Sequence, residues 1–246
     1  MAIIKKGKIH GKIGNYVYRV LNGQEIIQSY PRSIKPRGGT LLENESFGKV
    51  SQQSSRIYQL VKDFALNGIN EQLYHDMVKF FKKNFYSKTG VANNSNFDDW
   101  EEVSGFDRLV INSRVQIEDI LINIPQVSLS GNILNVQLYE FKRSHVSRKT
   151  IKDASYIAFG FRLIYYDFSS GMAEVVSDFD SERFIISKGF EDQKYEIPLV
   201  INGILIENGL LVFVFGLRLF ASLQSFGYLN NKEFNPCIIL GVWYKK

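Results

Sequence analysis

The part of the chain after residue 119 is a series of short runs in which apolar and polar residues alternate. Seven or eight such runs lie between residues 119 and 245, divided by Gly, Asn, Ser and Asp. A period of two is typical of strands with one buried face, and short strands at this spacing favour two antiparallel sheets packed face to face. We therefore predict an antiparallel β-sandwich at residues 120–246, immunoglobulin-like or similar. The runs are DILINIPQVSL, NILNVQLYEF, SYIAFGFRLIYYDF, MAEVVSDF, ERFIIS, KYEIPLVI, GLLVFVFGLRLFASL and CIILGVWYK.

Turn-forming residues stand where the hairpins of such a sandwich would reverse. Gly and Asn adopt the positive φ angles that tight hairpin turns require. A true immunoglobulin domain is not indicated, because Cys237 is the only cysteine and has no partner for a disulfide between the sheets. The expected turns are Ser130-Gly131-Asn132, Ser169-Ser170-Gly171, Asn202-Gly203 and Asn208-Gly209.

Residues 40–90 have helical periodicity instead, with apolar residues recurring every three or four positions. Thr40-Leu41-Leu42-Glu43 has the form of an N-terminal capping box, and Asn67-Gly68 predicts the end of the first helix. Asn70 can cap a second helix that ends before Thr89-Gly90. We predict a two-helix hairpin at 40–90 and a polar surface loop or linker at 91–119. The expected buried stripes are Phe47, Val50, Ser54, Ile57, Val61 and Phe64, then Leu73, Met77, Phe80, Phe81, Asn84 and Phe85.

Residues 1–39 form a basic, extended arm punctuated by glycine. In NYVYRVLNGQEIIQSYP, apolar residues alternate on both sides of Asn22-Gly23, a preferred pair for a type I′ turn, so the pattern predicts a β-hairpin. An isolated hairpin is marginal in water, so its strands are expected to join a larger sheet, in this chain or a neighbouring one. We interpret the glycines of GKIHGKIGN as bulges or close backbone approaches within a strand. Pro31 and Pro36 then extend the chain as a linker.

Positive charge is concentrated in this arm. The whole chain carries a formal net charge of +5. Residues 1–37 contain eight Lys or Arg and one acidic residue, Glu25, a net charge of +7, so the remaining residues carry about −2.

Three segments of the first 57 residues, GKIGNYVYR, NGQEIIQSYP and SFGKVSQQSSRI, resemble a family without an established activity that recurs among Bacteroidota and their mobile elements. The shared features are a G-x-x-G-N-x-V ribbon, a Q-x-x-x-S-x-P turn and an F-G-x-x-S helix, followed by a divergent β-rich half. The resemblance covers under a quarter of the chain and implies no catalytic residue. It implies that the ribbon and the first helix form one unit.

No pattern in the sequence matches a catalytic or metal-binding site. His10, His75 and His145 lie in three separate predicted elements, without a Cys, Asp or His at metal-ligand spacing. Cys237 stands at the start of an apolar strand and is interpreted as buried and unreactive. We therefore expect no catalytic residue, no metal and no cofactor, and a protein that is not an enzyme.

Two features of the β-rich half are ambiguous. Asp178, Asp180 and Glu182 alternate in SDFDSE, which we interpret as a solvated β-turn because the glycine and second acid of a calcium-binding loop are missing. Arg162 and Arg218 each follow a glycine by two positions in the apolar runs FGFRLIYY and FGLRLFA. We expect both arginines on an exposed face, since an inward arginine requires a carboxylate partner. A cluster of these acids and arginines around a pocket would favour an enzyme instead.

Three classes of function remain. The first is a structural protein that self-assembles into a homo-oligomer or filament, with its arm adding a strand to a neighbour. The second is a nucleic-acid-associated protein that binds phosphates nonspecifically through the arm, with tyrosines for stacking. The third, a carbohydrate-binding or hydrolytic β-sandwich, has the least support. The expected oligomer interface is Tyr16, Val17, Tyr18, Val20, Leu21, Ile26, Ile27 and Tyr30, and the alternative nucleic-acid contacts are Lys5, Lys6, Lys8, Lys12, Arg19, Arg32, Lys35 and Arg37.

The apolar segments are too short for a leader or a membrane span. The N-terminus MAIIKKGKIHGK lacks the apolar run of a secretory signal. The run LLVFVFGLRLFASL is interrupted by Arg218 and falls short of the roughly 20 residues that cross a bilayer. We expect a cytoplasmic protein of bacterial or phage origin, or a phage-particle component assembled in the cytoplasm.

Overall fold

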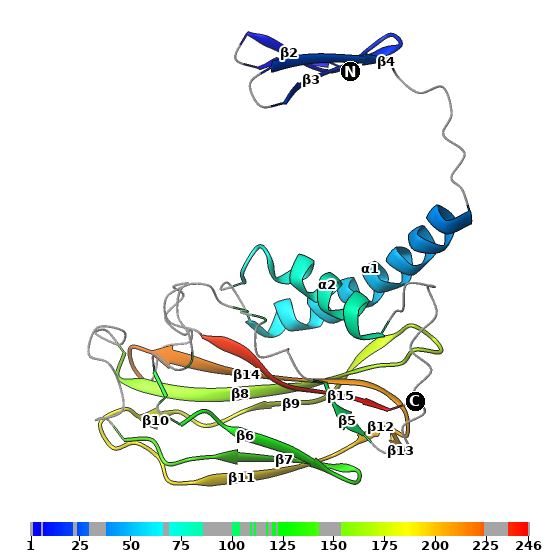
Figure 1. Ribbon diagram of the computed structural model, residues 1–246. Helices are drawn as coiled ribbons and strands as arrows, with labels where there is room; N and C mark the ends of the chain where they lie inside the picture. The colour runs from blue at the N-terminus through cyan, green and yellow to red at the C-terminus, as the bar shows by residue number, and fades with distance from the viewer. Residues whose placement is uncertain are drawn as a thin grey trace. The chain divides into compact units, whose positions relative to one another are not determined.

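The computed structural model shows an α+β chain of antiparallel sheets and two helices (Figure 1). The chain divides into two compact units, Met1–Leu41 and Leu42–Lys246. The residues that the structure describes are 2–5, 7–21, 24–29, 38–65, 69–85, 100–103, 109, 111, 117, 120–121, 123–142, 154–223 and 236–245.

The first unit contains a four-stranded antiparallel sheet. Its strands are β1 (Ala2–Lys5), β2 (Lys8–Ile13), β3 (Tyr16–Leu21) and β4 (Gln24–Ser29), in the order β1-β2-β3-β4. The predicted hairpin is β3–β4, closed by the pairing of Leu21 with Gln24. Its turn, Asn22-Gly23, lies outside the described residues. The larger sheet that this hairpin was expected to join comes from the same chain.

The glycines of the arm have a different role from the predicted one. Gly7 and Gly14 lie in the connections before and after β2, with φ angles of 75° and 57°. Gly14-Asn15 closes the β2–β3 hairpin directly after the pair Ile13 and Tyr16, and a glycine in the left-handed region suits such two-residue turns. Bulges were the wrong interpretation for these two glycines. Of the three glycines of GKIHGKIGN, only Gly11, with a φ of 108°, lies within a strand.

The two predicted helices are α1 (Gly38–Ala65) and α2 (Leu73–Phe85). Asn70 caps α2 as expected, because its Oδ1 accepts a hydrogen bond from the Gln72 amide at 3.0 Å. Thr40 is not a cap, since α1 already begins at Gly38. Phe47 was expected to be buried and is 52% exposed, because the buried face of α1 starts only at Val50. Among the described residues, neither helix has the length and apolarity of a membrane span.

The largest sheet of the second unit is built around one long strand. β14 (Gly209–Phe220) pairs with β8 (Tyr156–Tyr166) on one side and β15 (Cys237–Lys245) on the other. β9 (Ala173–Asp180) and β10 (Phe184–Ile185) both pair with β8, and β5 (Glu101–Glu102) pairs with β15. The order is β10-β8-β14-β15-β5, with β9 beside β8.

A smaller sheet has the order β11-β7-β6. It contains β6 (Gln126–Ser130), β7 (Ile133–Leu138) and β11 (Gln193–Pro198). A separate short hairpin joins β12 (Val200–Ile201) to β13 (Ile204–Leu205) through the predicted turn Asn202-Gly203. Both turn residues have positive φ, 51° and 80°, as a type I′ turn requires.

The second unit has three layers, because both faces of the large sheet are covered (Figure 1). In β14, Leu210, Val212 and Val214 pack into a cluster with α1 and α2. The alternate residues Leu211, Phe213 and Phe215 pack into a second cluster with the β11-β7-β6 sheet. The helices are therefore part of the same core as the strands.

The predicted surface loop at 91–119 also contributes to this core. Leu109, Ile111 and Ile117 are at most 5% exposed, and β5 extends the large sheet at its edge. The Ile111 carbonyl accepts a hydrogen bond from the Asn70 amide at 2.7 Å, which ties the segment to the start of α2. The prediction of a surface linker was wrong for these residues, because apolar side chains close the edge of the core.

Replacing a large buried side chain of β14 by a small one should destabilise the whole second unit. Phe213 is fully buried. We expect Phe213→Ala to lower the free energy of unfolding by about 3–5 kcal/mol, measured by urea denaturation. The unfolding transition measured by the circular dichroism of the helices and the transition measured by tryptophan fluorescence should shift together. Met172→Ala, at a side chain 53% exposed, is the control and should change stability by less than about 0.5 kcal/mol. Separate transitions for helix and sheet would contradict the shared core.

Candidate functional site

The sheet of the first unit has one apolar face. The cross-strand pairs Ile4–Ile9, Ile13–Tyr16 and Tyr18–Ile27 place these side chains on the same face, because directly opposed residues of antiparallel strands share a face. Ile4 is 77% exposed, Ile27 62% and Tyr16 53%. We call this surface the apolar face; its members are Ile4, Ile9, Ile13, Tyr16, Tyr18, Val20 and Ile27.

The opposite side of the same sheet carries the basic residues and is called the basic face. Lys12 is opposite Val17, and Arg19 follows Val17 by two positions on β3, so both lie on this side. Lys8 and His10 occupy the alternating positions before Lys12 on β2. The Arg19 Nη2 donates to Gln28 Oε1 at 2.8 Å, across the hairpin. The basic face contains Ile3, Lys8, His10, Lys12, Val17, Arg19, Ile26 and Gln28.

The predicted arm residues therefore separate into two groups. Of the expected oligomer interface, Tyr16, Tyr18, Val20 and Ile27 share the apolar face, whereas Val17 and Ile26 lie on the other. Leu21 and Lys5 belong to β3 and β1. The remaining arm residues of both predictions lie outside the described residues: Tyr30, Lys6, Arg32, Lys35 and Arg37.

In the second unit, the two G-x-R sequences meet. Gly160 is paired directly with Gly216, so Arg162 and Arg218 flank this glycine pair from opposite directions along β8 and β14. The Phe64 ring of α1 lies over the two glycines, and an added Cβ would be 3.1 Å from that ring at Gly216 and 3.5 Å at Gly160. Both guanidinium groups face the same ring, 5.4 Å and 5.6 Å from its centroid.

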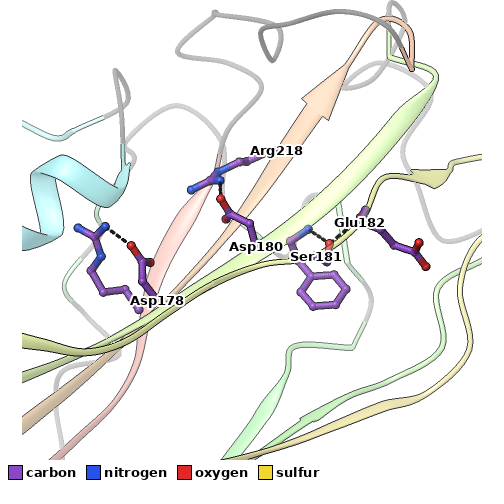
Figure 2. A network of polar contacts seen from close by, with 7 residues as sticks. Asp178, Asp180, Ser181, Glu182 and Arg218 are labelled. Atoms are coloured by element: carbon purple, nitrogen blue, oxygen red, sulfur yellow. Dashed lines mark hydrogen bonds and ion pairs between the residues drawn. The ribbon is translucent and has the colours of Figure 1, made fainter. Parts of the chain in front are cut away.

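Each arginine also has a carboxylate partner on β9, and Figure 2 shows Arg218 beside Asp180. Arg162 Nη2 contacts Asp178 Oδ2 at 2.5 Å, and Arg218 forms an ion pair with Asp180. Arg218 reaches Asp180 across β8 at the row of Gly160, where a Cβ would be 2.5 Å from Asp180 Oδ1. Arg162 Nη1 further donates to the Leu60 carbonyl of α1 at 2.9 Å.

This arrangement corrects two predictions. The arginine side chains are only 15% and 20% exposed, so the expectation of an exposed position was wrong. Asp178 and Asp180 lie in β9 and not in a solvated turn. The arginines are covered because α1 lies over this face of the sheet, which the alternation within single strands does not reveal. The two acids lie in a strand because their segment pairs with β8. The repeated F-G-x-R sequence was the available signal.

The three acids do not converge on one point. Asp178 and Asp180 each face their own arginine, while the Glu182 side chain points away (Figure 2). The neighbouring Ser181 hydroxyl has a structural role. It accepts a hydrogen bond from the Phe159 amide at 3.0 Å and donates one to the Glu182 carbonyl at 2.7 Å. Within the described part of the chain, no three His, Cys, Asp or Glu side chains are arranged to hold a metal ion.

A small hollow adjoins the Phe64 ring. Phe64, Gly216, Arg218 and Cys237 help to line its roughly 10 Å³, which is about the space of one water molecule. Burial raises the pKa of the Cys237 thiol far above its usual value, and the positive charges of Arg218 and Arg162 offset this only in part. A buried thiol of this kind is a poor nucleophile. The arrangement is suited to joining α1 to the sheet.

No protein-family model matches this chain. No curated protein is similar to it in sequence.

The two paired acids should contribute to stability, in contrast to Glu182. Removing Asp178 or Asp180 leaves a mostly covered arginine without its carboxylate. We expect Asp178→Ala and Asp180→Ala each to lower the free energy of unfolding by about 1–2 kcal/mol, because both acids are half exposed. Glu182→Ala is the matched control and should cost under about 0.5 kcal/mol. Equal effects at all three positions in urea denaturation would contradict the ion-pair assignment.

The reactivity of the Cys237 thiol should depend on the packing of the Phe64 ring against the sheet. We expect the thiol of the folded protein to react with a thiol-specific disulfide reagent at pH 8 only slowly, because it is buried and its pKa is raised. The denatured protein should react at the rate of a free cysteine. Phe64→Ala removes a ring that lines the hollow and should accelerate labelling under native conditions. Fast labelling of the unchanged protein would contradict the buried position.

Proposed function

We propose that this protein is a non-enzymatic structural protein that self-assembles through its N-terminal sheet, and that two copies pair by packing their apolar faces together. The observation that carries the proposal is the exposure of that face, with Ile4 77% and Ile27 62% exposed. A stable sheet normally buries its apolar face against a second layer. The described part of the first unit consists of this sheet and the first residues of α1.

A second copy of the same face is the occupant that the charges favour. Among the described residues, the side of the sheet that carries the apolar face has one carboxylate, that of Glu25, which is opposite Val20 at the end of the hairpin. The basic face would repel its own copy, because Lys12 and Arg19 would oppose like charges. An apolar, nearly uncharged surface is self-complementary and suits a closed two-fold dimer. Burying each large apolar side chain contributes about 1.5–3 kcal/mol.

Strand addition at the edge strands β1 and β4 is a second way for copies to join. Edge pairing satisfies backbone hydrogen bonds but leaves the apolar face in water. We therefore assign the main contact to the face and propose edge pairing as the route from dimers to a filament. In this proposal the second unit is a sandwich-like scaffold. The resemblance to a Bacteroidota family and a cytoplasmic or phage-particle location remain proposals from the sequence.

Ile3 and Ile4 provide a matched test, because these neighbours on β1 are 62% and 77% exposed and lie on opposite faces. We expect Ile4→Lys to dissociate the oligomer, since it places a charge in the paired apolar surface. Ile3→Lys adds the same charge to the basic face and should leave the molecular mass unchanged. Size-exclusion chromatography with light scattering on the full chain measures both. The proposal would be overturned if the protein without substitutions were a monomer, or if the two substitutions had equal effects on the molecular mass.

A further inference from the structure

We propose that the basic face of the N-terminal sheet binds the phosphate backbone of double-stranded nucleic acid without sequence specificity. This inference goes beyond self-assembly and does not depend on it, because it uses the opposite side of the sheet. Its ligand is a polyanion with closely and regularly spaced phosphates.

The first support is the gathering of cations on one surface. Lys12 and Arg19 are exposed and come from adjacent strands, and Lys8 and His10 extend the same side along β2. Alternate residues of a strand are about 6.7 Å apart, so the sheet presents its cations at a spacing that several phosphates of one duplex can meet. The sequence pattern alone left these residues distributed along a ribbon.

The second support is the position of the carboxylate. Glu25 is the only acidic residue among residues 1–37. Its pairing with Val20 puts it on the apolar face, away from Lys12 and Arg19. Besides the apolar Ile3, Val17 and Ile26, the basic face therefore carries cations and amides without an acid among its described residues, and this charge distribution complements a polyanion.

The third support distinguishes a duplex from a single strand. Nonspecific binders of single strands stack bases on aromatic side chains that lie beside the cations. Here Tyr16 and Tyr18 lie on the apolar face, opposite to Lys12 and Arg19. The described part of the basic face has no Phe, Tyr or Trp, and its one ring is that of His10, so contacts to backbone phosphates are the main interaction that it can offer. Tyr16 and Tyr18 are therefore not placed to stack bases beside Lys12 and Arg19, whereas Tyr30 lies outside the described residues.

Among the cations of the basic face, Arg19 has its side-chain orientation fixed by a hydrogen bond. Its hydrogen bond to Gln28 Oε1 at 2.8 Å holds one end of the guanidinium against β4. A guanidinium has five N–H donors in a planar fork, so a group held at one end can still make a two-pronged contact to a phosphate. Arg19 and Lys12 are therefore the positions at which the proposal is tested.

The test is the salt dependence of binding, measured by fluorescence anisotropy of a labelled duplex of about 20 base pairs with the full chain. Three phosphate contacts, from Lys8, Lys12 and Arg19, predict that affinity falls at least about 40-fold between 50 and 200 mM salt. Lys12→Gln and Arg19→Gln should each weaken binding at low salt, and should each reduce the ratio of the affinities at 50 and 200 mM salt about 3.5-fold. Arg19→Lys keeps the charge and should keep this ratio of affinities.

Lys79→Gln is the control for net charge, because it removes one positive charge from α2, where the lysine side chain is 78% exposed. It should leave the affinity and the salt dependence unchanged. The far-ultraviolet circular dichroism of all variants should match that of the unchanged protein, since Lys12 and Arg19 are exposed.

Four outcomes would overturn the proposal. They are no duplex binding at 50 mM salt, the same loss with Lys79→Gln as with Lys12→Gln, tighter binding of the matching single strand that depends on Tyr16 or Tyr18, and binding to vesicles of anionic lipid at least as tight as binding to the duplex. Loss of duplex binding in Arg19→Gln with an unchanged oligomeric mass would support it independently of the assembly proposal.

Discussion

The second unit depends on the seating of Phe64 over two paired glycines. Gly160 and Gly216 leave space for an aromatic ring directly on the sheet backbone, and Arg162 and Arg218 enclose the ring from both ends. A Cβ at Gly216 would lie 3.1 Å from the Phe64 ring, and a Cβ at Gly160 would first meet Asp180 Oδ1 at 2.5 Å, so a larger residue at either glycine would disturb the contacts around the ring. This contact brings α1 close enough to cover one face of β14, which then becomes the buried centre of three layers.

The ion pairs follow from the same geometry. Covering a face that carries two arginines requires compensation of their charge, and Asp178 and Asp180 on the outer strand β9 provide it. Half-exposed carboxylates reduce the desolvation cost, because water still reaches them while the guanidinium groups lie over the ring. The result resembles a catalytic cluster in composition, yet each acid is paired separately. These residues hold α1 against the sheet.

The first unit shows the opposite situation. Its sheet has four strands and no second layer within its described residues, and its two sides differ in chemistry: one is apolar and aromatic, the other basic. A sheet alternates its side chains with a period of two, so a single ribbon can present two surfaces to two partners. Packing of the apolar faces of two copies would leave both basic faces on the outside, and assembly and polyanion binding are compatible for this reason.

Local sequence determined the long strands β8, β14 and β15, the hairpin β3–β4, the two helices and the Asn70 cap, since alternation, helical periodicity and turn chemistry are properties of neighbouring residues. The unbroken apolar run of β14 also contained the sign of a strand buried on both faces. Tertiary structure alone decided the pairing of Gly160 with Gly216, the partners of Arg162 and Arg218, and the burial of Ile111 in a predicted surface loop. These features depend on which surfaces meet across long stretches of chain, and the period of a single strand carries no information about what will cover it.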